Sequence, residues 1–466
     1  MVFALNNQSP YPCHSLECLG ITPDSKVIVV GLGVTGMSVL RYLLKQQLHP
    51  MLVDSRANPP GLEELRDNCL ELDITTGEHA FDHLDTATHL IVSPGVALTT
   101  PEIEAVRQSG IQILSDIDLF AIEAAAPIIA ITGSNGKTTV TTLVGNMIAH
   151  AGKSVAVGGN IGTPALDLLN APEPDAYVLE LSSFQLENTC HLQPEAAVVL
   201  NLSADHLDRY DDFSDYSQAK ASIYNDATVI IKNFCEQSLD LNDNCRHHDK
   251  KKRYFGITDD QECHFRLEMI DDKEWLVAYD QPLLAVSDIL IQGRHNISNA
   301  LAALALVDAI NIHPASAVAV LREFPGLPHR MEMVRDLHEV TWINDSKATN
   351  VGACLAALQG INSRIILIAG GDAKAADFSV LSNSINEKVS DMIVLGKDAD
   401  LLQNTFQTIT NMHHVHTIED AVTLATSLSS SGDTVLLSPA CASLDMFKDY
   451  QARGDAFKNA VMRLPQ

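Results

Sequence analysis

The stretch ITGSNGKTTV, residues 131–140, has the end of a phosphate-binding loop but not its beginning. A Walker A loop reads G-x-x-x-x-G-K-[ST]. Gly136, Lys137 and Thr138 supply the end of this pattern, whereas Ile131 stands where its first glycine is expected and the nearest glycine is Gly133. Since Gly-Lys-Thr-Thr after an apolar run is rarely accidental, the stretch predicts a shortened phosphate loop in an α/β domain.

The residues around this loop predict its structural context. An apolar run at residues 128–131 reads as a strand, and a helix is expected over residues 139–150. Backbone N–H groups of the loop could then wrap phosphates, with Lys137 reaching the terminal ones and the Thr138 hydroxyl binding Mg²⁺. Glu180 ends a later apolar run, where a Walker-B-like carboxylate would hold Mg²⁺, although it could equally be an ordinary acid at a strand end.

A second glycine loop lies near the start of the chain. Gly31, Gly33 and Gly36 follow the apolar run 27–30 and open an expected helix over residues 37–47, and Asp54 ends the next run. This is the dinucleotide fingerprint in its proper context. It indicates only that a phosphorylated nucleotide can sit on a helix N-terminus, so NAD and a UDP group are both candidates. A tight turn without a ligand is the remaining alternative.

Apolar runs alternate with amphipathic stretches along the chain, which predicts βαβ units and parallel sheets. The pattern restarts twice, and the 466 residues therefore divide into three α/β blocks. We expect the boundaries near residues 115 and 326, giving domains 1–115 (with 1–25 as an extension), 116–326 and 327–466. The polar residues 240–280 are expected at the periphery of the middle block. Further strands are expected at residues 52–53, 89–92, 176–180, 197–200, 364–368, 392–395 and 434–437.

Charge and composition exclude several classes of partner. The net charge is -28, from 59 acidic and 31 basic residues, which argues against nucleic acid or an anionic membrane as a partner. No apolar run approaches 18 residues, and the first residues lack the basic start of a secretory signal. The nine cysteines form no C-x-x-C pair. These features are typical of a cytoplasmic protein.

Longer motifs carry a resemblance that covers the chain from about residue 26 onward. With the phosphate loop they resemble the Mur ligases, in which the shortened loop is the usual form. Two motifs, NDSKATN and SPACASLD, have forms similar to those of family members that add D-glutamate. These forms differ from those of members that add other residues and from folylpolyglutamate synthase. The motifs are GGNIG (158–162), YVLELSSFQL (177–186), ADHLDRY (204–210), GLPHRME (326–332), NDSKATN (344–350), GGDAKAADF (370–378) and LLSPACASLDMFKDYQARG (436–454).

The resemblance implies a fold and an activity. The fold is a Rossmann-like UDP-binding N-terminal domain, a P-loop ATPase-like central domain with a mixed sheet, and a Rossmann-like C-terminal domain that brings the amino acid. The activity is an ATP-dependent amide ligation of D-glutamate to UDP-N-acetylmuramoyl-L-alanine through an acyl phosphate, in peptidoglycan precursor synthesis, with two Mg²⁺ ions and a monomeric enzyme. Alternatives are another Mur-type or folylpolyglutamate-type ligase, an NAD-dependent oxidoreductase, and a non-enzymatic ATP-binding module.

The resemblance also assigns residues to roles. Lys137, Glu180, His206 and Lys220 are the implied catalytic residues; Lys220 is implied to be carbamylated, and Thr138, Glu180, His206 and Lys220 to hold metal. ATP is implied to contact Gly133, Ser134, Asn135, Gly136, Lys137, Thr138, Thr139, Asn296, Asn299, Arg330 and Asp345. The UDP substrate is implied to contact Gly33, Val34, Thr35, Gly36, Asp54, Ser55, Arg56, Ser93, Pro94, Gly95, Asn160, Ser182 and Gln185. D-glutamate is implied to contact Lys347, Thr349, Lys374, Ser443 and Tyr450.

Several of these residues have ordinary alternative interpretations from the sequence alone. Lys220 could be a solvated helix lysine, His206 a core histidine, Asn160 a turn residue and Arg56 a surface cation. The implied D-glutamate residues and the phosphate loop fall in different blocks. We therefore expect the C-terminal block to swing onto the central one, with residues 326–328 as the hinge.

Overall fold

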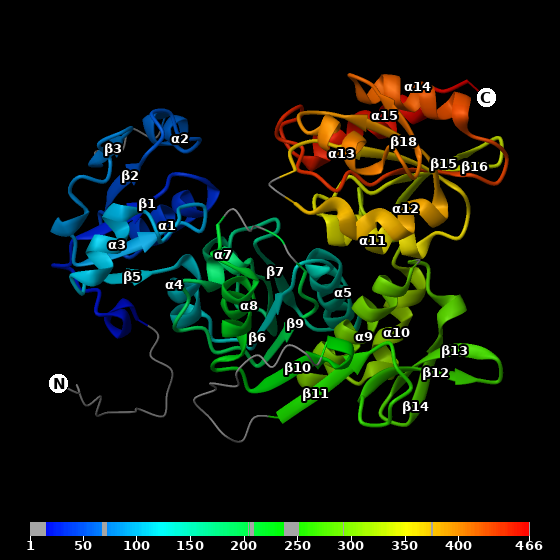
Figure 1. Ribbon diagram of the computed structural model, residues 1–466. Helices are drawn as coiled ribbons and strands as arrows, with labels where there is room; N and C mark the ends of the chain where they lie inside the picture. The colour runs from blue at the N-terminus through cyan, green and yellow to red at the C-terminus, as the bar shows by residue number, and fades with distance from the viewer. Residues whose placement is uncertain are drawn as a thin grey trace.

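The structure is a computed structural model that describes residues 15–67, 72–203, 205, 209–236, 251–291, 293–373 and 376–465. Its strands form three sheets of five, nine and six strands. The N-terminal and C-terminal sheets lie on either side of the central one (Figure 1). Apolar strand residues that are buried on both faces make up the cores of all three sheets.

The N-terminal sheet is entirely parallel, in the order β3-β2-β1-β4-β5, which is the Rossmann order without its sixth strand. Leu19 and Ile21 are buried in this domain, so part of the predicted extension belongs to its core. The elements are β1 (Val27–Val30), α1 (Val34–Lys45), β2 (Met51–Asp54), α2 (Leu62–Asp67), β3 (Ile74–Thr76), β4 (His89–Val92), α3 (Pro101–Gln108) and β5 (Gln112–Leu114).

The central sheet is mixed, in the order β14-β13-β12-β11-β10-β9-β6-β8-β7, with antiparallel pairing of β12, β13 and β14 at one edge. Alternate residues of β6 pack on opposite faces, so that Ile129 and Ile131 lie in a different apolar cluster from Ile128 and Ala130. The strands are β6 (Ile128–Thr132), β7 (Val155–Gly159), β8 (Ala176–Glu180), β9 (Ala196–Val199), β10 (Val229–Asn233), β11 (Lys251–Gly256), β12 (Phe265–Ile270), β13 (Lys273–Ala278) and β14 (Gln281–Ala285).

Helices cover both faces of the central sheet. Residues of α5 and α9 share one apolar cluster with β6, and residues of α4 and α6 share the other with the N-terminal domain. The helices are α4 (Asp116–Glu123), α5 (Lys137–His150), α6 (Ala165–Leu168), α7 (Ser183–Leu186), α8 (Phe213–Ala221), α9 (Arg294–Ala309) and α10 (Pro314–Glu323).

The C-terminal sheet has the order β15-β16-β20-β17-β18-β19 and is parallel except for its edge strand β15. Its strands are β15 (Glu332–Leu337), β16 (Val340–Asn344), β17 (Ile365–Gly370), β18 (Val389–Leu395), β19 (Asn411–His414) and β20 (Thr434–Leu437). Its helices are α11 (Val351–Gly360), α12 (Ser382–Lys388), α13 (Ala399–Phe406), α14 (Ile418–Leu428) and α15 (Tyr450–Met462).

This architecture confirms the predicted α/β class, with Rossmann-like outer domains and a mixed central sheet. The predicted helix after the second glycine loop begins three residues early, at Val34, because Gly33 already caps it. Within the polar stretch 240–280, the described residues 251–280 contribute β11, β12 and β13, which lie next to the edge strand β14 of the central sheet. Across the described residues, the helices are all too short or too polar to span a membrane.

Candidate active site

The shortened phosphate loop joins β6 to α5, and its glycines allow the chain to turn tightly. Gly136 has φ +82°, and a Cβ there would lie 2.4 Å from Oδ1 of Asn299. A side chain at this position would therefore be strained and would collide with α9. The loop N–H groups lie at the N-terminus of α5, where the helix dipole favours an anion.

Lys137, the first residue of α5, folds back over this loop. Its Nζ donates to the carbonyl oxygens of Gly133 at 2.8 Å and Ser134 at 3.1 Å. Burial lowers the pKa of Lys137, and nearby Arg330 adds to this effect, whereas Glu180 opposes it. The ammonium is thus held over the position where the loop would bind phosphate.

Side chains from other elements brace the loop. The hydroxyls of Ser134 and Tyr216 lie 2.8 Å apart, and Ser134 also donates to the carbonyl of Ser203. The backbone N–H of Asn135 donates to Oδ1 of Asn201 at 2.9 Å. These contacts fix the loop conformation without a ligand, so the phosphate site is largely preorganised.

Glu180, at the end of β8, has one carboxylate oxygen engaged and one available. Asn160 Nδ2 donates to its Oε1 at 2.8 Å. Glu180 is 3% exposed, and its Oε2 has no hydrogen-bond partner within the described part of the chain. A buried carboxylate oxygen without a donor is costly unless a cation binds it. The chemistry of Glu180 therefore fits a Mg²⁺ ligand, with the Thr138 hydroxyl as an oxygen donor from the loop.

Lys220, in α8, is buried, so the alternative interpretation of a solvated helix lysine is wrong. It is 2% exposed, its Nζ lies 3.5 Å from the Thr132 hydroxyl and 4.8 Å from the centre of the Tyr216 ring. Burial lowers the pKa of Lys220 well below its usual value, and the charge of Lys137 adds to this effect. The side chain of Lys220 thus lies in the same electrostatic neighbourhood as Lys137 and Glu180.

The C-terminal domain contacts the phosphate loop directly. Arg330 donates to the Thr138 hydroxyl. Asn350, the N-cap of α11, donates from Nδ2 to Asp205 Oδ2 at 3.0 Å and to Asn135 Oδ1 at 3.3 Å. The two domains are therefore in contact at the loop.

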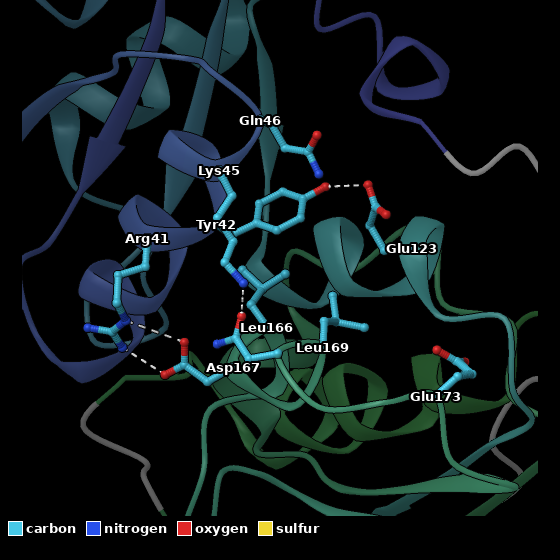
Figure 2. A pocket seen from close by; sticks show the side chains of 10 residues that line it. Arg41, Tyr42, Lys45, Gln46, Glu123, Leu166, Asp167, Leu169 and Glu173 are labelled. Carbon is cyan, nitrogen blue, oxygen red and sulfur yellow. Dashed lines mark hydrogen bonds and ion pairs between the residues drawn. The ribbon is translucent and has the colours of Figure 1, made fainter.

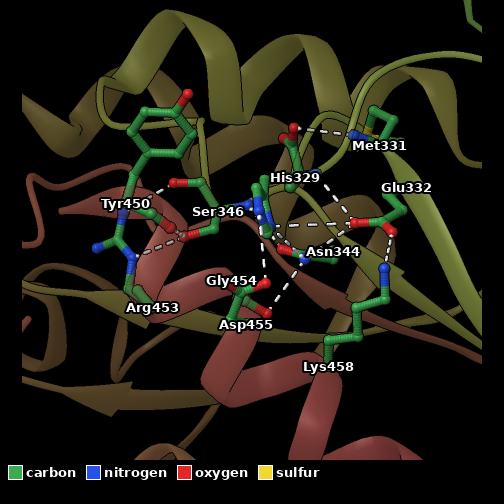
Figure 3. A network of polar contacts seen from close by, with 11 residues as sticks. His329, Met331, Glu332, Asn344, Ser346, Tyr450, Arg453, Gly454, Asp455 and Lys458 are labelled. Carbon is green, nitrogen blue, oxygen red and sulfur yellow. Dashed lines mark hydrogen bonds and ion pairs between the residues drawn. The ribbon is translucent and has the colours of Figure 1, made fainter.

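The segment that enters the C-terminal domain is held by a buried polar network (Figure 3). His329 has φ +63°, and Asn344 Nδ2 lies 2.9 Å from its Nδ1. Gly454 makes room for this ring, since a Cβ there would lie 2.3 Å from His329 Nδ1. Next along the network, Glu332 accepts from the His329 N–H at 3.0 Å and pairs with Lys458. The network fixes the backbone on either side of Arg330.

Asp345 lies at the end of β16, close to Arg330. It accepts from the Ser438 hydroxyl at 2.9 Å and from the Met331 N–H at 3.2 Å. Burial raises the pKa of Asp345 to about 7, against the lowering effect of these hydrogen bonds and of Arg330. The contact to ribose or phosphate implied for Asp345 stays a prediction.

Of the residues implied for D-glutamate, Lys347 and Tyr450 lie together. The Lys347 Nζ is 4.1 Å from the centre of the Tyr450 ring, which is a cation–π geometry. Thr349 follows Lys347 in the same turn, and Ser443 is buried in the loop before α15. Lys374 lies outside the described residues, as does His206 among the implied metal ligands.

The residues implied for the UDP group surround the first glycine loop. Gly36 is required because a Cβ there would lie 1.8 Å from the Gly31 carbonyl oxygen. Ser93, after β4, donates to the same carbonyl at 3.1 Å. The structure thus brings the loop at residues 93–95 beside the N-terminus of α1.

Asp54 and Arg56 are paired with each other rather than open. Asp54 Oδ2 accepts from the Leu32 N–H at 2.7 Å, and Arg56 donates to both carboxylate oxygens. Arg56, although 54% exposed, is therefore more than a free surface cation. Their implied contacts with uracil stay a prediction.

Ser182 and Gln185 serve a structural purpose that the sequence analysis did not anticipate. Ser182 Oγ accepts from the Gln185 N–H, while Gln185 Oε1 accepts from the Ser182 N–H at 3.1 Å, so the two form a capping box for α7. The S-x-x-Q spacing was the available signal. Asn296 and Asn299 are hydrogen-bonded to each other in α9, beside Gly136.

Sequence reasoning missed Asn350, Tyr216 and Asn201, which contact the phosphate loop. Asn350 ends a motif that was recognised, and its place before an apolar helix is an N-cap signal. Tyr216 and Asn201 carry no local signal, because their contacts with the loop depend on tertiary structure.

Comparison with known proteins covers most of the chain. Residues 25–115 match the family model "Mur ligase MurD-like, N-terminal domain", residues 131–307 match "Mur ligase middle domain", and residues 329–441 match "Mur ligase, glutamate ligase domain".

Relatives that match nearly the whole chain include two proteins with the same name. UDP-N-acetylmuramoylalanine--D-glutamate ligase of Methylococcus capsulatus is 44% identical over 446 residues, covering 96% of each chain. The protein of that name from Pseudomonas aeruginosa is 45% identical over 448 residues, covering 95% of this chain and 99% of the relative. Among solved structures, MurC from Thermotoga maritima has a TM-score of 0.59 at 19% identity, covering 94% of this chain and 99% of its own. MurF from the same organism, in complex with ADP, has a TM-score of 0.58 at 14% identity, covering 94% and 96%.

Proposed function

The chain belongs to the Mur ligase family, and from this premise we propose that it is an ATP-dependent ligase that joins D-glutamate to UDP-N-acetylmuramoyl-L-alanine. It would act in the cytoplasm, in peptidoglycan precursor synthesis, and would catalyse the reaction for which its relatives are named. One observation carries the proposal: residues of two domains lie together at one phosphate loop. Lys137, Glu180 and Lys220 come from the central domain, and Arg330 and Asn350 come from the C-terminal domain.

The reaction requires two steps. The alanyl carboxylate of the UDP substrate attacks the γ-phosphorus of ATP, the bond to the bridging oxygen breaks, and ADP leaves. The amine of D-glutamate then attacks the carbon of the acyl phosphate, and inorganic phosphate leaves as the amide forms and the amine loses its proton. A free carboxylate is a poor electrophile, so phosphorylation supplies the leaving group. Because two anions meet in the first step, the site must concentrate positive charge.

Cationic side chains of this chain fit that requirement. Lys137 would bind the β- and γ-phosphates, while Arg330 would contact them from the C-terminal domain. Mg²⁺ bound to Thr138 and Glu180, with a second ion near His206, would neutralise charge on the phosphates. Asn296, Asn299 and Asp345 would contact the nucleoside, and the remaining loop residues would donate N–H groups. These remaining residues are Gly133, Ser134, Asn135, Gly136 and Thr139.

Lys220 is proposed to be carbamylated. Its buried amine lies beside Lys137, where a second ammonium is unfavourable. A neutral amine can add to CO₂ and release a proton, which leaves an anionic carbamate. That anion would be a further metal ligand and would pair with the positive charge around it.

The two substrates would enter from opposite domains. The UDP group would bind the N–H groups at Gly33–Gly36 and at residues 93–95, and Asn160 would face the alanyl end. Lys347 and Lys374 would hold the carboxylates of D-glutamate, with Thr349 and Ser443 as hydroxyl donors and Tyr450 as a wall.

A panel of amino acids tests the proposed activity. With ATP and UDP-N-acetylmuramoyl-L-alanine present, ADP release is expected with D-glutamate and to stay at background with L-alanine, L-lysine or meso-diaminopimelate. The release is measured by a coupled assay and the product by mass. Turnover with another member of the panel instead would identify a different Mur-type ligase, and ATP binding without any release would indicate a non-catalytic module.

The binding of D-glutamate is expected to weaken above neutral pH. Burial, with the charges of Arg330 and Lys137, lowers the pKa of Lys347 to about 8. A lysine with a lowered pKa is charged below that value and loses its charge above it. The KM for D-glutamate should therefore rise about tenfold between pH 7 and pH 9, as the charged fraction falls.

Lys347→Arg is the matched control, because a guanidinium stays charged over this range. The rise in KM should be absent from the variant, even if its KM is higher throughout. Ionisation of the substrate amine affects both proteins equally. The same rise in the variant would show that Lys347 does not cause it.

A further inference from the structure

We propose that Arg209 is a positioning residue that sets the UDP-binding loop for the substrate, an inference that rests on the proposed function. Arg209 belongs to the central domain, but its guanidinium donates to two carbonyls of the N-terminal domain. Nη1 donates to the Pro94 oxygen at 2.9 Å, and Nη2 donates to the Val96 oxygen at 3.3 Å. These carbonyls flank Gly95, in the loop proposed to bind diphosphate.

The guanidinium is held in place from its other sides. Nη2 pairs with Glu187 Oε2 at 2.9 Å, and the side chains of Arg209 and Glu187 are only 14% and 16% exposed. The Arg209 Cζ lies 4.2 Å from the centre of the Phe184 ring. A planar guanidinium can stack on a ring while donating within its plane, whereas an ammonium cannot. Arg209 is therefore a rigid anchor for the loop.

Peptide geometry explains how this anchor would act on a ligand. In a planar trans peptide, the C=O and the following N–H point in opposite directions. The hydrogen bond from Arg209 points the Pro94 carbonyl toward the central domain. The Gly95 N–H, on the same peptide, therefore points away from the central domain. Arg209 does the same at Val96 for the N–H of Ala97. The contact thus fixes the direction of the donors that an anion would meet.

The same anchor connects to the phosphate loop through packed aromatic rings. Phe184 stacks with Tyr210 at 6.2 Å, and Tyr210 contacts Tyr216 at 5.4 Å between ring centres. The Tyr216 hydroxyl lies 2.8 Å from that of Ser134, in the phosphate loop. Arg209 therefore lies at one end of a continuous contact path between the two proposed nucleotide sites.

The interface offers a matched control at Arg41, shown in Figure 2. Arg41, in α1, also crosses between the N-terminal and central domains, where it pairs with Asp167 at 2.7 Å. It lines a cavity of about 320 Å³ together with Tyr42, Lys45 and Glu123, and its second ion pair, with Glu64 at 3.1 Å, also lies away from residues 93–96. Loss of Arg41 removes an interdomain ion pair without affecting the loop carbonyls.

The test measures binding of UDP by calorimetry, and steady-state kinetics, for Arg209→Met, Arg209→Lys and Arg41→Met. Arg209→Met should weaken UDP binding and raise the KM for the UDP substrate at least about tenfold, since the donor directions are no longer fixed. Its KM for ATP should change less than twofold. UDP binding by Arg209→Lys should be nearly as weak as that of Arg209→Met, because an ammonium restores the charge but not the paired hydrogen bonds of the guanidinium to the two carbonyls. Arg41→Met should bind UDP within about twofold of the wild type.

Each contrary result has a distinct meaning. Unchanged UDP binding in Arg209→Met and Arg209→Lys would overturn the role of Arg209, and so would equal weakening in Arg41→Met, which would assign the effect to the domain interface as a whole. Thermal unfolding shows whether each variant is folded. If Arg209→Met is misfolded, UDP binding by Arg209→Lys decides whether Arg209 positions the loop. Failure of the wild type to bind UDP would overturn the proposed substrate and this inference together.

Discussion

Replacing Lys137 with alanine is expected to abolish ligation while the protein stays folded. Among the described residues, the hydrogen bonds of Lys137 Nζ go to two carbonyls of its own loop, and its burial already disfavours the charge. Its loss should therefore change stability little. The charge-assisted contact to the phosphates is lost in the transition state, where it matters most, so kcat/KM should fall by at least about 10³-fold. ADP release and thermal unfolding measure the two effects.

Lys153→Ala is the control for this prediction. Lys153 is exposed and lies just beyond the C-terminal end of α5, away from the phosphate loop. Its replacement therefore also removes one lysine charge near α5 but leaves the phosphate loop unchanged. Its turnover should match that of the wild type. Near-normal turnover in Lys137→Ala would contradict the assignment of this loop to ATP.

The strands that the sequence predicted best are those buried on both faces. The predicted runs 27–30, 89–92 and 434–437 coincide with β1, β4 and β20. Each lies inside a parallel sheet, where continuous apolar sequence is required. The edge strands β14 and β19 were not predicted, because their exposed residues interrupt the apolar pattern. Local composition thus predicts central strands more readily than edge strands.

The site shows a similar division between local and long-range information. The glycine loops were predictable because a tight turn before a helix requires glycine, as the close approach at Gly136 shows. The contacts of Asn350 with Asn135, and of Arg209 with Pro94, join residues 215 and 115 positions apart. No periodicity or spacing encodes such pairs, since they depend on how whole domains pack.

Burial was the property that sequence alone could not supply at Lys220. Lys220 is flanked by Ala219 and Ala221, and an isolated helix with this sequence would expose the lysine. The packing of α8 leaves it 2% exposed instead. The same amine that would be a solvated cation on a free helix is thereby placed where its charged form is unfavourable.

Replacing Lys220 with alanine is accordingly expected to leave the protein folded but nearly inactive, with kcat lowered by about 10³-fold. Within the described residues, the buried Lys220 amine makes one long hydrogen bond, 3.5 Å to Thr132, so its removal should not destabilise the fold strongly. If the function of Lys220 is to carry a carbamate, the missing group is an anion. Acetate or propionate should therefore restore part of the activity by occupying the space that alanine leaves.

Lys220→Met makes this prediction specific to the vacated space. Methionine fills most of the volume of the lysine side chain but carries no charge, so this variant should be as inactive as the alanine variant and should not respond to the acids. Rescue of Lys220→Ala by short alkylamines instead of acids would indicate that the ammonium itself is required. Full activity of either variant without additives would exclude any role of Lys220 in the reaction. Rescue of the alanine variant alone, and by acids alone, follows only if the site needs a carboxylate-like anion at the position of the Lys220 amine.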